Sequence, residues 1–332
     1  MRSSPPRVLF ICGSLNQTTM MHEIAGNLEG VDASFTPFYC DGFLHWLTRH
    51  GWLDFTILGG QMRRHTDEYL ARHRLPLDER GDQGPYDLVV TCTDLIVQRN
   101  VRGRPLVLVQ EGMTDPENLG YQLVKTLGFP RWVASTAATG LSLAYSKFCV
   151  ASEGYRDLFI SKGVPADRLV VTGIPNFDDC RAYRDNDFPH RGYVLVATSD
   201  TRETFKLDHR RAFWTRVAEI AAGRPIIVKL HPNENARRST REIHRALPDA
   251  RVYADGNVHH MIANCDVLIT QWSSVTYVGL ALGKECHSYF DLQELARLLP
   301  LQNGGTSARR IADVCRDVME EARAEARWRA AS

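Results

Sequence analysis

The sequence lacks the features that mark several classes of protein. Its eight cysteines include no Cys-x-x-Cys pair, which argues against both a disulfide framework and a zinc site. With 40 basic and 39 acidic residues, the formal net charge is +1, so no electrostatic field favours nucleic acid or an acidic membrane. Neither a Gly-x-Gly-x-x-Gly loop nor a P-loop lysine occurs, which excludes dinucleotide dehydrogenases and P-loop ATPases.

Long apolar stretches are also missing. No run of about 18 apolar residues occurs, so the sequence predicts no membrane-spanning helix. The apolar run Val8–Cys12 is too short for the core of a signal peptide and is typical of a strand. We therefore expect a cytoplasmic protein whose only membrane contact, if any, is made from the surface at the inner face of the membrane.

The chain of 332 residues is long enough for two domains of roughly 150 residues each. Short apolar runs bounded by Gly, Pro, Asp or Asn alternate with amphipathic segments, which indicates an α/β fold with two doubly wound parallel sheets. The predicted strands are residues 8–12, 88–92, 106–110, 148–151 and 169–172, followed by 193–197, 226–230, 251–253 and 267–270.

A polar stretch without apolar periodicity, residues 175–191, separates these two groups of strands. We expect an N-terminal domain of residues 1–178, a linker of residues 179–191, and a C-terminal domain of residues 192–332. Residues 311–331 predict an amphipathic helix with a solvated end, which would close the C-terminal domain.

Two polar clusters follow predicted strands in the second half of the chain. Lys229-Leu230-His231-Pro232-Asn233-Glu234 overlaps the end of one strand, and Gln271-Trp272-Ser273-Ser274 follows another and leads into an apolar, helix-compatible stretch. Ligands of open α/β sheets bind at the carboxyl ends of the strands. Two hydroxyl groups beside the free amides of a helix N-terminus suit a phosphate. These clusters predict a site for a nucleotide diphosphate.

These segments resemble known nucleotide-sugar enzymes. Residues 152–178 are similar to the domain junction of UDP-N-acetylglucosamine 2-epimerases, whereas residues 229–234 and 266–284 are similar to CDP-glycerol glycerophosphotransferases and capsule glycosyltransferases. The resemblance implies the GT-B fold, in which two Rossmann-like domains face each other across an interdomain cleft. Two departures stand out. The epimerase Asp-Ser-Gly-Gly signature is absent, and Gln271 replaces an acid that the glycerophosphotransferases carry.

The donor site expected in the C-terminal domain consists of Arg202, Lys229, His231, Gln271, Ser273 and Ser274. Preorganised donors such as His231 would stabilise the charge that develops on the leaving phosphates. All of these residues except Gln271 also have a plainer interpretation. His231 could pack a loop, Lys229 could be a solvated edge lysine, the serines could only cap a helix, and Arg202 could pair with a neighbouring acid.

The N-terminal domain contains the candidate general base. Glu111 follows the strand 106–110, where a carboxylate could activate an acceptor hydroxyl, although it could also cap the next segment. His22 is the second candidate, with Asn16 and Gln17 as acceptor-side residues in the same stretch. A lone histidine is more often structural.

An aromatic stretch with nearby basic residues has no assigned role. Phe43, Trp46, Trp52 and Phe55 could stack on an acceptor sugar, but a hydrophobic helix face is the commoner cause. The basic run Arg63-Arg64-His65 could contact an anionic acceptor or a lipid headgroup, although a solvated helix face is the default.

Together these features predict a transferase that moves a glycosyl or glycerophosphoryl group from a nucleotide-diphosphate donor to a saccharide or polyol hydroxyl. The resemblance implies a role in cell-surface polysaccharide synthesis. We expect no metal or other cofactor and no nucleic-acid partner. Two alternatives remain: an isomerase similar to UDP-N-acetylglucosamine 2-epimerase, and a non-catalytic nucleotide-sugar-binding protein. The nucleotide base, the acceptor, the stereochemistry and the oligomeric state stay open.

Overall fold

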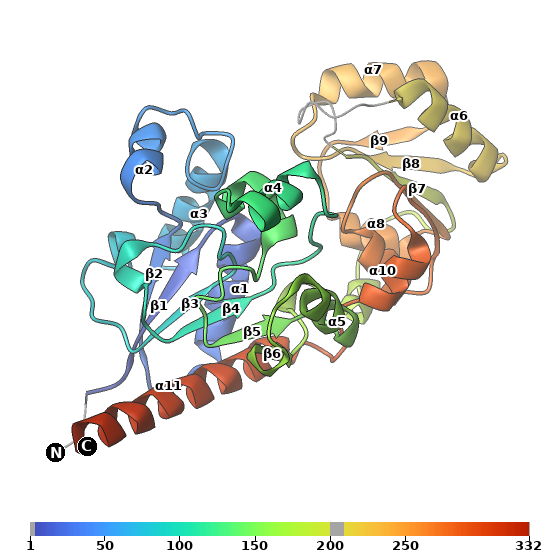
Figure 1. Ribbon diagram of the computed structural model, residues 1–332. Helices are drawn as coiled ribbons and strands as arrows, with labels where there is room; N and C mark the ends of the chain where they lie inside the picture. Colours follow the sequence, from blue (N-terminus) through green and yellow to red (C-terminus); the bar gives the residue numbers. More distant parts are fainter. Residues whose placement is uncertain (1–3, 200–208, 332) are drawn as a thin grey trace. The chain divides into compact units, whose positions relative to one another are not determined.

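The computed structural model describes residues 4–199 and 209–331 and divides into two compact units (Figure 1). Unit 1 comprises Met1–Asp178 together with Gly305–Ser332, and unit 2 comprises Asp179–Gly304. Each unit is built around its own parallel sheet. Every helix in the described part of the chain is either too short or too polar to span a bilayer.

The sheet of unit 1 has six parallel strands in the order β2-β1-β3-β4-β5-β6. Its central strands are buried along their whole length and almost entirely apolar, as expected for a parallel sheet covered on both faces. Because β1 pairs with both β2 and β3, the strand order reverses between β1 and β3. The strands are β1 Arg7–Cys12, β2 Asp32–Pro37, β3 Leu88–Thr91, β4 Leu106–Val109, β5 Lys147–Val150 and β6 Leu169–Val171.

Helices cover this sheet, and local sequence signals set their ends. Ser14 caps α1 by accepting a hydrogen bond from the Gln17 amide, and Gly163 ends α5 with the positive φ that glycine tolerates. The helices of unit 1 are α1 Leu15–Gly26, α2 Gly42–Arg49, α3 Gly60–Arg72, α4 Leu119–Leu127, α5 Glu153–Lys162 and α11 Ser307–Ala331, with 3-10 turns at Glu79–Gly81, Arg99–Val101, Arg131–Ala138, Ala166–Arg168 and Pro175–Phe177.

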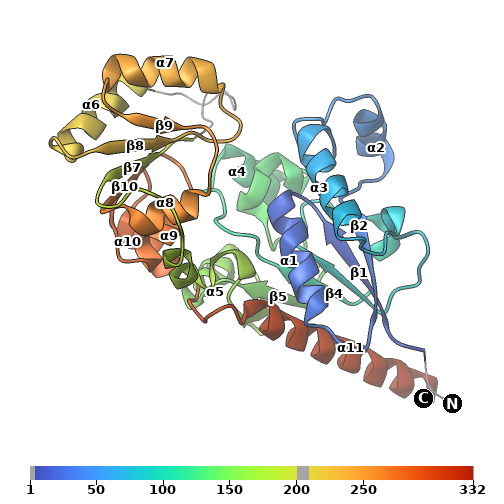
Figure 2. The same cartoon turned by 180° about the vertical axis from the view of Figure 1, so that it is seen from behind.

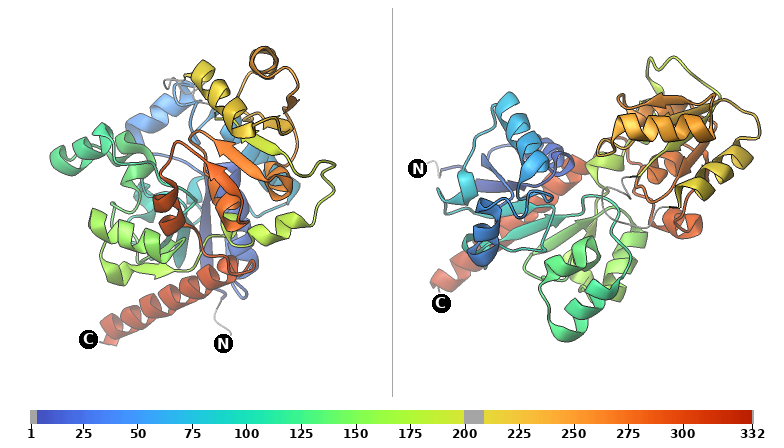
Figure 3. Two further views of the ribbon diagram at one scale, coloured as in Figure 1. Left: turned by 90° about the vertical axis from the view of Figure 1, so that its right-hand side faces the viewer. Right: turned by 90° about the horizontal axis from the view of Figure 1, so that it is seen from above.

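The last helix, α11, belongs to a different domain from the one predicted. We expected it to close the C-terminal domain, but α11 packs on α1 and on strands β3, β4 and β5 of unit 1 (Figures 2 and 3). Ile311, Cys315 and Val318 recur at helical spacing on its buried face. The periodicity identified the helix correctly, but periodicity cannot say which sheet an apolar face covers.

Unit 2 has a five-stranded parallel sheet in the order β11-β10-β7-β8-β9, whose strand order reverses between β7 and β10. Helices α6 and α7 pack on one face, and α8, α9 and α10 lie on the other (Figure 1). The elements are β7 Val194–Ala197, α6 Arg210–Ala221, β8 Ile226–Lys229, α7 Ala236–Ala246, β9 Arg251–Tyr253, α8 Val258–Asn264, β10 Val267–Thr270, α9 Thr276–Ala281, β11 Glu285–His287 and α10 Leu292–Leu298.

All nine predicted strands occur, so the α/β prediction with two parallel sheets is confirmed. Two strands were missed, β2 with the sequence DASFTP and β11 with the sequence ECH. Both are edge strands that begin with an exposed acidic residue, Asp32 or Glu285, so they lack the continuous apolar run that marks a central strand. The expected linker also differs, because Cys180–Arg184 forms a 3-10 helix of unit 2 that packs on α8 and α9.

Candidate functional site

The carboxyl ends of three neighbouring strands in unit 2 are held together by two adjacent hydroxyl residues. Thr198, directly after β7, donates a hydrogen bond to the Glu234 carboxylate and accepts one from the His231 amide at 3.0 Å, both in the loop after β8. Ser199 donates to the Trp272 carbonyl at 3.1 Å, in the loop after β10. The loops after β8 and β10 are thus fixed on either side of β7, where the strand order reverses and α/β ligands bind.

Glu234 is the buried anchor of this arrangement. Its carboxylate forms an ion pair with Arg210 at the start of α6, and it also accepts the His231 amide at 3.1 Å and the Ser239 hydroxyl at 3.4 Å. The Glu234 side chain has no exposed surface. A buried charge needs such partners to offset its desolvation, so this network holds the backbone at His231 in one position.

The His231 ring has a defined hydrogen-bonding direction. Its Nδ1 accepts the Asn233 backbone amide at 3.2 Å, so the proton of the neutral imidazole lies on Nε2. The residue is half-buried, at the carboxyl edge of the sheet. His231 is therefore suited to donate a hydrogen bond from Nε2 to a phosphate oxygen. Arg202, the other cationic candidate, lies outside the described residues.

The contacts of Lys229 fit neither of its two interpretations, a donor-site residue or a solvated edge lysine. The side chain is buried, and its Nζ donates to the carbonyls of Leu230 and Ala254, at 2.8 Å each. Burial lowers the pKa of Lys229, an effect that Asp255 and Glu234 oppose. Its ammonium group joins the ends of β8 and β9, so its observed contacts are structural rather than directed at a ligand.

The loop after β10 presents two hydroxyl groups at the same edge of the sheet. Ser273 and Ser274 are half-exposed, and their hydroxyls make no hydrogen bond with the described residues. Neither serine caps α9, because the cap position is Val275 and has no side-chain bond. Gln271 is buried below them, and its carbonyl accepts the Ser288 hydroxyl at 3.0 Å. The loop thus keeps two hydroxyls available next to the fixed β8 loop.

In unit 1, Glu111 lies at the end of β4 and is held by the start of α1. One carboxylate oxygen accepts the Ser14 hydroxyl at 2.9 Å, and the other accepts the Gln17 side-chain amide at 2.5 Å. Ser14 also caps α1, so the carboxylate lies at the positive end of this helix. Each carboxylate oxygen can accept a second hydrogen bond, and the residue is half-buried. The carboxylate of Glu111 is thus held in one orientation and can still accept further hydrogen bonds.

Close packing supports this carboxylate. A Cβ added to Gly13 would lie 1.7 Å from Oε1 of Gln17, so any other residue at this position would move the Gln17 amide from the place where it bonds Glu111. The Gln110 side chain donates to the Gly112 carbonyl at 2.7 Å and accepts the Ala151 amide at 2.9 Å, which fixes the turn after β4. The backbone at Glu111 is therefore as restrained as its side chain.

The other candidates in unit 1 are not joined to Glu111 in the same way. His22 lies further along α1, where its Nδ1 is 3.1 Å from the Tyr69 hydroxyl and its ring packs on Phe35 and His73. Burial and the neighbouring His73 lower its pKa. Asn16 is exposed in the first turn of α1. Of the acceptor-side candidates, Gln17 alone contacts the carboxylate of Glu111.

No group of three or more His, Cys, Asp or Glu side chains with metal-site geometry occurs within residues 4–199 and 209–331. The sequence contains one Asp-x-Asp triplet, Asp185-Asn186-Asp187, and both of its acidic residues are exposed. All eight cysteines are buried and free.

Sequence reasoning missed Thr198, Ser199 and Glu234 as organisers of the unit 2 site. Glu234 belongs to the motif of residues 229–234, and a carboxylate three residues after His231 is well placed to bond back to the His231 amide. A second signal lay in Ser14 and Gln17, which have the spacing of a capping box. The Gln17 side chain bonds Glu111 instead of the Ser14 amide, which is a sign that this helix start has a further role.

The comparisons with known proteins concern the whole chain. No protein-family model and no curated protein sequence matches it. Among solved structures, the UDP-GlcNAc 2-epimerase of Neisseria meningitidis bound to UDP-GlcNAc is similar with a TM-score of 0.57 and 11% identity, over 93% of this chain and 99% of that chain. The Methanocaldococcus jannaschii UDP-GlcNAc 2-epimerase, in complex with UDP-GlcNAc and UDP, has a TM-score of 0.53 and 12% identity, over 93% and 99%.

A third similar structure is HepE from Anabaena in complex with UDP, with a TM-score of 0.50 and 14% identity, over 98% of this chain and 100% of that chain. Identities this low establish the fold alone. The chain therefore has the GT-B fold, two Rossmann-like α/β domains, which the resemblance of its motifs predicted.

Proposed function

We propose that this chain is a transferase that moves a glycosyl or glycerophosphoryl group from a nucleotide-diphosphate donor to an acceptor hydroxyl. The observation that carries the proposal is the polar edge of the unit 2 sheet, where Thr198 and Ser199 hold the loops after β8 and β10. That edge combines the Nε2 donor of His231 with the hydroxyls of Ser273 and Ser274 at the reversal of strand order.

In this proposal the unit 2 site binds the diphosphate of the donor. When the bond to the leaving nucleotide breaks, negative charge grows on its terminal phosphate. Hydrogen bonds from His231, Ser273 and Ser274 would stabilise that charge. They are preorganised because the Glu234 network fixes the His231 loop and Ser199 holds the loop after β10. We assign the same role to Arg202, as an expectation from the sequence.

Glu111 is the proposed general base. Its carboxylate would take the proton of the acceptor hydroxyl as the acceptor oxygen forms its new bond, to carbon for a glycosyl group or to phosphorus for a glycerophosphoryl group. Ser14 and Gln17 would keep the carboxylate in the orientation that this transfer needs. Gln17 could also bond the acceptor hydroxyl, and we assign Asn16 and His22 no chemical step.

The first experiment is a thermal-shift measurement with UDP, CDP and GDP. A ligand present at 100 times its Kd stabilises the folded state by about 2.7 kcal/mol, which is a rise of several degrees in Tm. We expect one nucleotide to produce this rise, His231→Ala to lose it, and His65→Ala, an exposed histidine of α3, to keep it. No shift with any nucleotide would remove the support for a nucleotide-diphosphate site.

The proposal includes no metal, because the charge on the leaving phosphates is assigned to protein donors. Turnover that survives EDTA would support this part. Loss of turnover in EDTA with recovery in Mg²⁺ would contradict it, and the exposed Asp185 and Asp187 would then be the first residues to substitute.

A second candidate function is isomerisation of the sugar of UDP-N-acetylglucosamine, since the oriented carboxylate of Glu111 could equally abstract a proton from carbon. Deuterium incorporation at C2 of the sugar in D₂O, without any acceptor, would favour it. A non-catalytic nucleotide-sugar-binding protein predicts donor binding that Glu111→Ala leaves unchanged, and no consumption of any donor.

A further inference from the structure

One side of unit 1 exposes an unusual number of large apolar side chains. Helix α2 has no buried residue, although Phe43, Leu44 and Trp46 occupy its first turns. Phe43 is 70% exposed and stacks on Trp46, with ring centroids 5.8 Å apart. In the turn that follows, Trp52 and Phe55 are 68% and 77% exposed. The apolar residues of this helix are therefore at most partly buried, and none of them belongs to the core of unit 1.

A second exposed stripe lies on α4. Leu119 and Leu127 are 85% and 67% exposed and share one helix face with Leu123. Tyr121, on the opposite face, packs against the turn that follows. The exposed stripe therefore adds nothing to the core, and Phe129 and Trp132 continue it into the next turn. Helices α2 and α4 both lie on the side of unit 1 opposite α11 (Figures 1 and 2).

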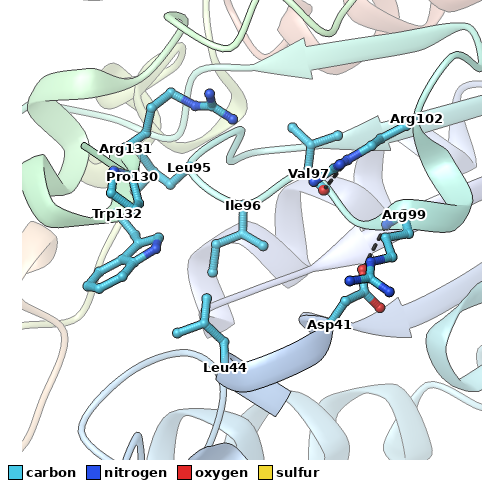
Figure 4. Close-up of a pocket in the computed structure, with 10 residues that line it drawn as sticks. All are labelled: Asp41, Leu44, Leu95, Ile96, Val97, Arg99, Arg102, Pro130, Arg131 and Trp132. Carbon is cyan, nitrogen blue, oxygen red and sulfur yellow. Dashed lines mark hydrogen bonds between the residues drawn. The ribbon is translucent and has the colours of Figure 1, made fainter. Parts of the chain in front are cut away.

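A basic pocket of about 270 Å³ separates the two apolar groups (Figure 4). Leu44 of α2 and Trp132 from the turn after α4 both line it, so the two apolar groups flank its mouth. The remaining lining residues are Asp41, Leu95, Ile96, Val97, Arg99, Arg102, Pro130 and Arg131. The pocket thus has an apolar floor with arginines at its rim.

The charge in this pocket is positive and largely uncompensated. Within the described residues, Arg99, Arg102 and Arg131 form no salt bridge. Asp41 is acidic, but its carboxylate is engaged by the Arg80 guanidinium at 3.3 Å and by the Arg99 backbone amide at 2.7 Å. Nε of Arg102 and of Arg131 donates to a backbone carbonyl, at 3.1 and 3.2 Å, so the terminal nitrogens are the donors that remain for a ligand. Three such groups beside an apolar floor suit an anion that carries an apolar part.

We propose that this face of unit 1, defined by Phe43, Trp46, Trp52, Phe55, Leu119, Leu123, Leu127, Phe129 and Trp132 around the arginine pocket, binds an anionic lipid bilayer. The pocket takes a lipid phosphate. The exposed rings and leucines enter the interface between headgroups and acyl chains, where tryptophan is favoured. An anionic bilayer matches both the positive charge of the pocket and the apolar groups around it. A soluble sugar phosphate would match the charge alone and leave the apolar groups in water. A symmetric contact with a second copy would bring arginine clusters together.

The test is co-sedimentation of the whole chain with vesicles. Mixed phosphatidylcholine–phosphatidylglycerol vesicles should bind the protein, and pure phosphatidylcholine vesicles should bind it far more weakly. Each arginine near an anionic surface contributes about fivefold in affinity, so Arg99→Gln/Arg102→Gln should weaken binding about 30-fold. Phe43→Ala/Leu119→Ala, one residue from each apolar group, should weaken it on the order of tenfold or more. All four side chains are exposed, so these variants should fold.

Matched controls distinguish binding through this face from non-specific adsorption to vesicles. Arg237→Gln/Arg241→Gln on α7 removes two exposed arginines, and Trp328→Ala on α11 removes an exposed ring; both should bind vesicles as the wild type does. Brominated lipid should quench tryptophan fluorescence of the wild type. The proposal is overturned by absent vesicle binding, by binding that both face variants retain, or by binding of free glycerol phosphate alone. A dimer in solution that Phe43→Ala/Leu119→Ala dissociates would also overturn it. Nucleotide binding by unit 2 plays no part in any of these outcomes.

Discussion

Replacing Glu234 with glutamine tests whether the buried carboxylate holds the unit 2 site together. The substitution keeps the shape of the side chain but removes its charge. Four groups point at this carboxylate: the Arg210 guanidinium, the Thr198 and Ser239 hydroxyls, and the His231 amide. All four are donors there, so the amide nitrogen of glutamine must face at least one of them.

The magnitude follows from burial. The side chain of Glu234 has no exposed surface and that of Arg210 is only 6% exposed, so water cannot replace the lost partner. Removing one member of a buried ion pair costs about 3–5 kcal/mol, because the other charge stays buried without compensation. A loss of about 3 kcal/mol is a large share of the 5–15 kcal/mol by which domains are stable.

The assay must report on each unit separately, because a chain with two units has no single free energy of unfolding. Hydrogen exchange does so. A loss of about 3 kcal/mol should speed exchange of the β7 and β8 amides roughly 100-fold and leave β1 and β3 unchanged. Glu219→Gln, an exposed residue of α6, is the control. If Glu234→Gln exchanges like this control, the carboxylate does not anchor the loop and the reasoning fails.

Two further predictions concern one close contact and one half-buried histidine. Gly13→Ala should destabilise unit 1 by about 1–3 kcal/mol in urea unfolding, because its Cβ would displace the Gln17 side chain. The same change in a Gln17→Ala background should cost almost nothing, and an equal cost in both backgrounds would refute the contact. Burial, with a smaller contribution from His260, lowers the pKa of His259 to about 4. The unfolded chain takes up this proton below about pH 6.5, so stability present at neutral pH should be lost between about pH 6.5 and 4, by about 1–3 kcal/mol. In denaturant titrations at several pH values, His259→Phe should lack this part of the pH dependence; an identical profile would contradict the assignment.

The fold was predictable from the sequence because the central strands are buried on both faces. Strands such as Leu106–Val109 and Val267–Thr270 are buried throughout and almost entirely apolar, and turn residues bound them. The edge strands β2 and β11 carry no such run. The sequence also places His231, Ser273 and Glu111 at strand ends, and the structure puts them there. Their chemical roles remain predictions.

The remaining features of the candidate site depend on contacts between residues that are distant in sequence. Lys229 was assigned to a ligand because it alternates with His231 along a strand, but its ammonium group reaches two backbone carbonyls, one of them in the loop after β9. Thr198 and Glu234 are 36 residues apart, and no local pattern joins them. The same holds for Ser14 and Glu111, which are 97 residues apart. Hydrogen bonds of this kind appear only once the sheet order is known.

The return of α11 to unit 1 has a consequence for the order in which the chain acquires its structure. Unit 2 is one continuous segment, whereas unit 1 is made of two segments that flank it in sequence. During synthesis, residues 179–304 can fold as soon as they emerge, while the first sheet waits for the helix that covers β3, β4 and β5. Until then the apolar surface under Ile311 and Val318 is open to water and to other chains. The half of the protein made first is therefore the half completed last.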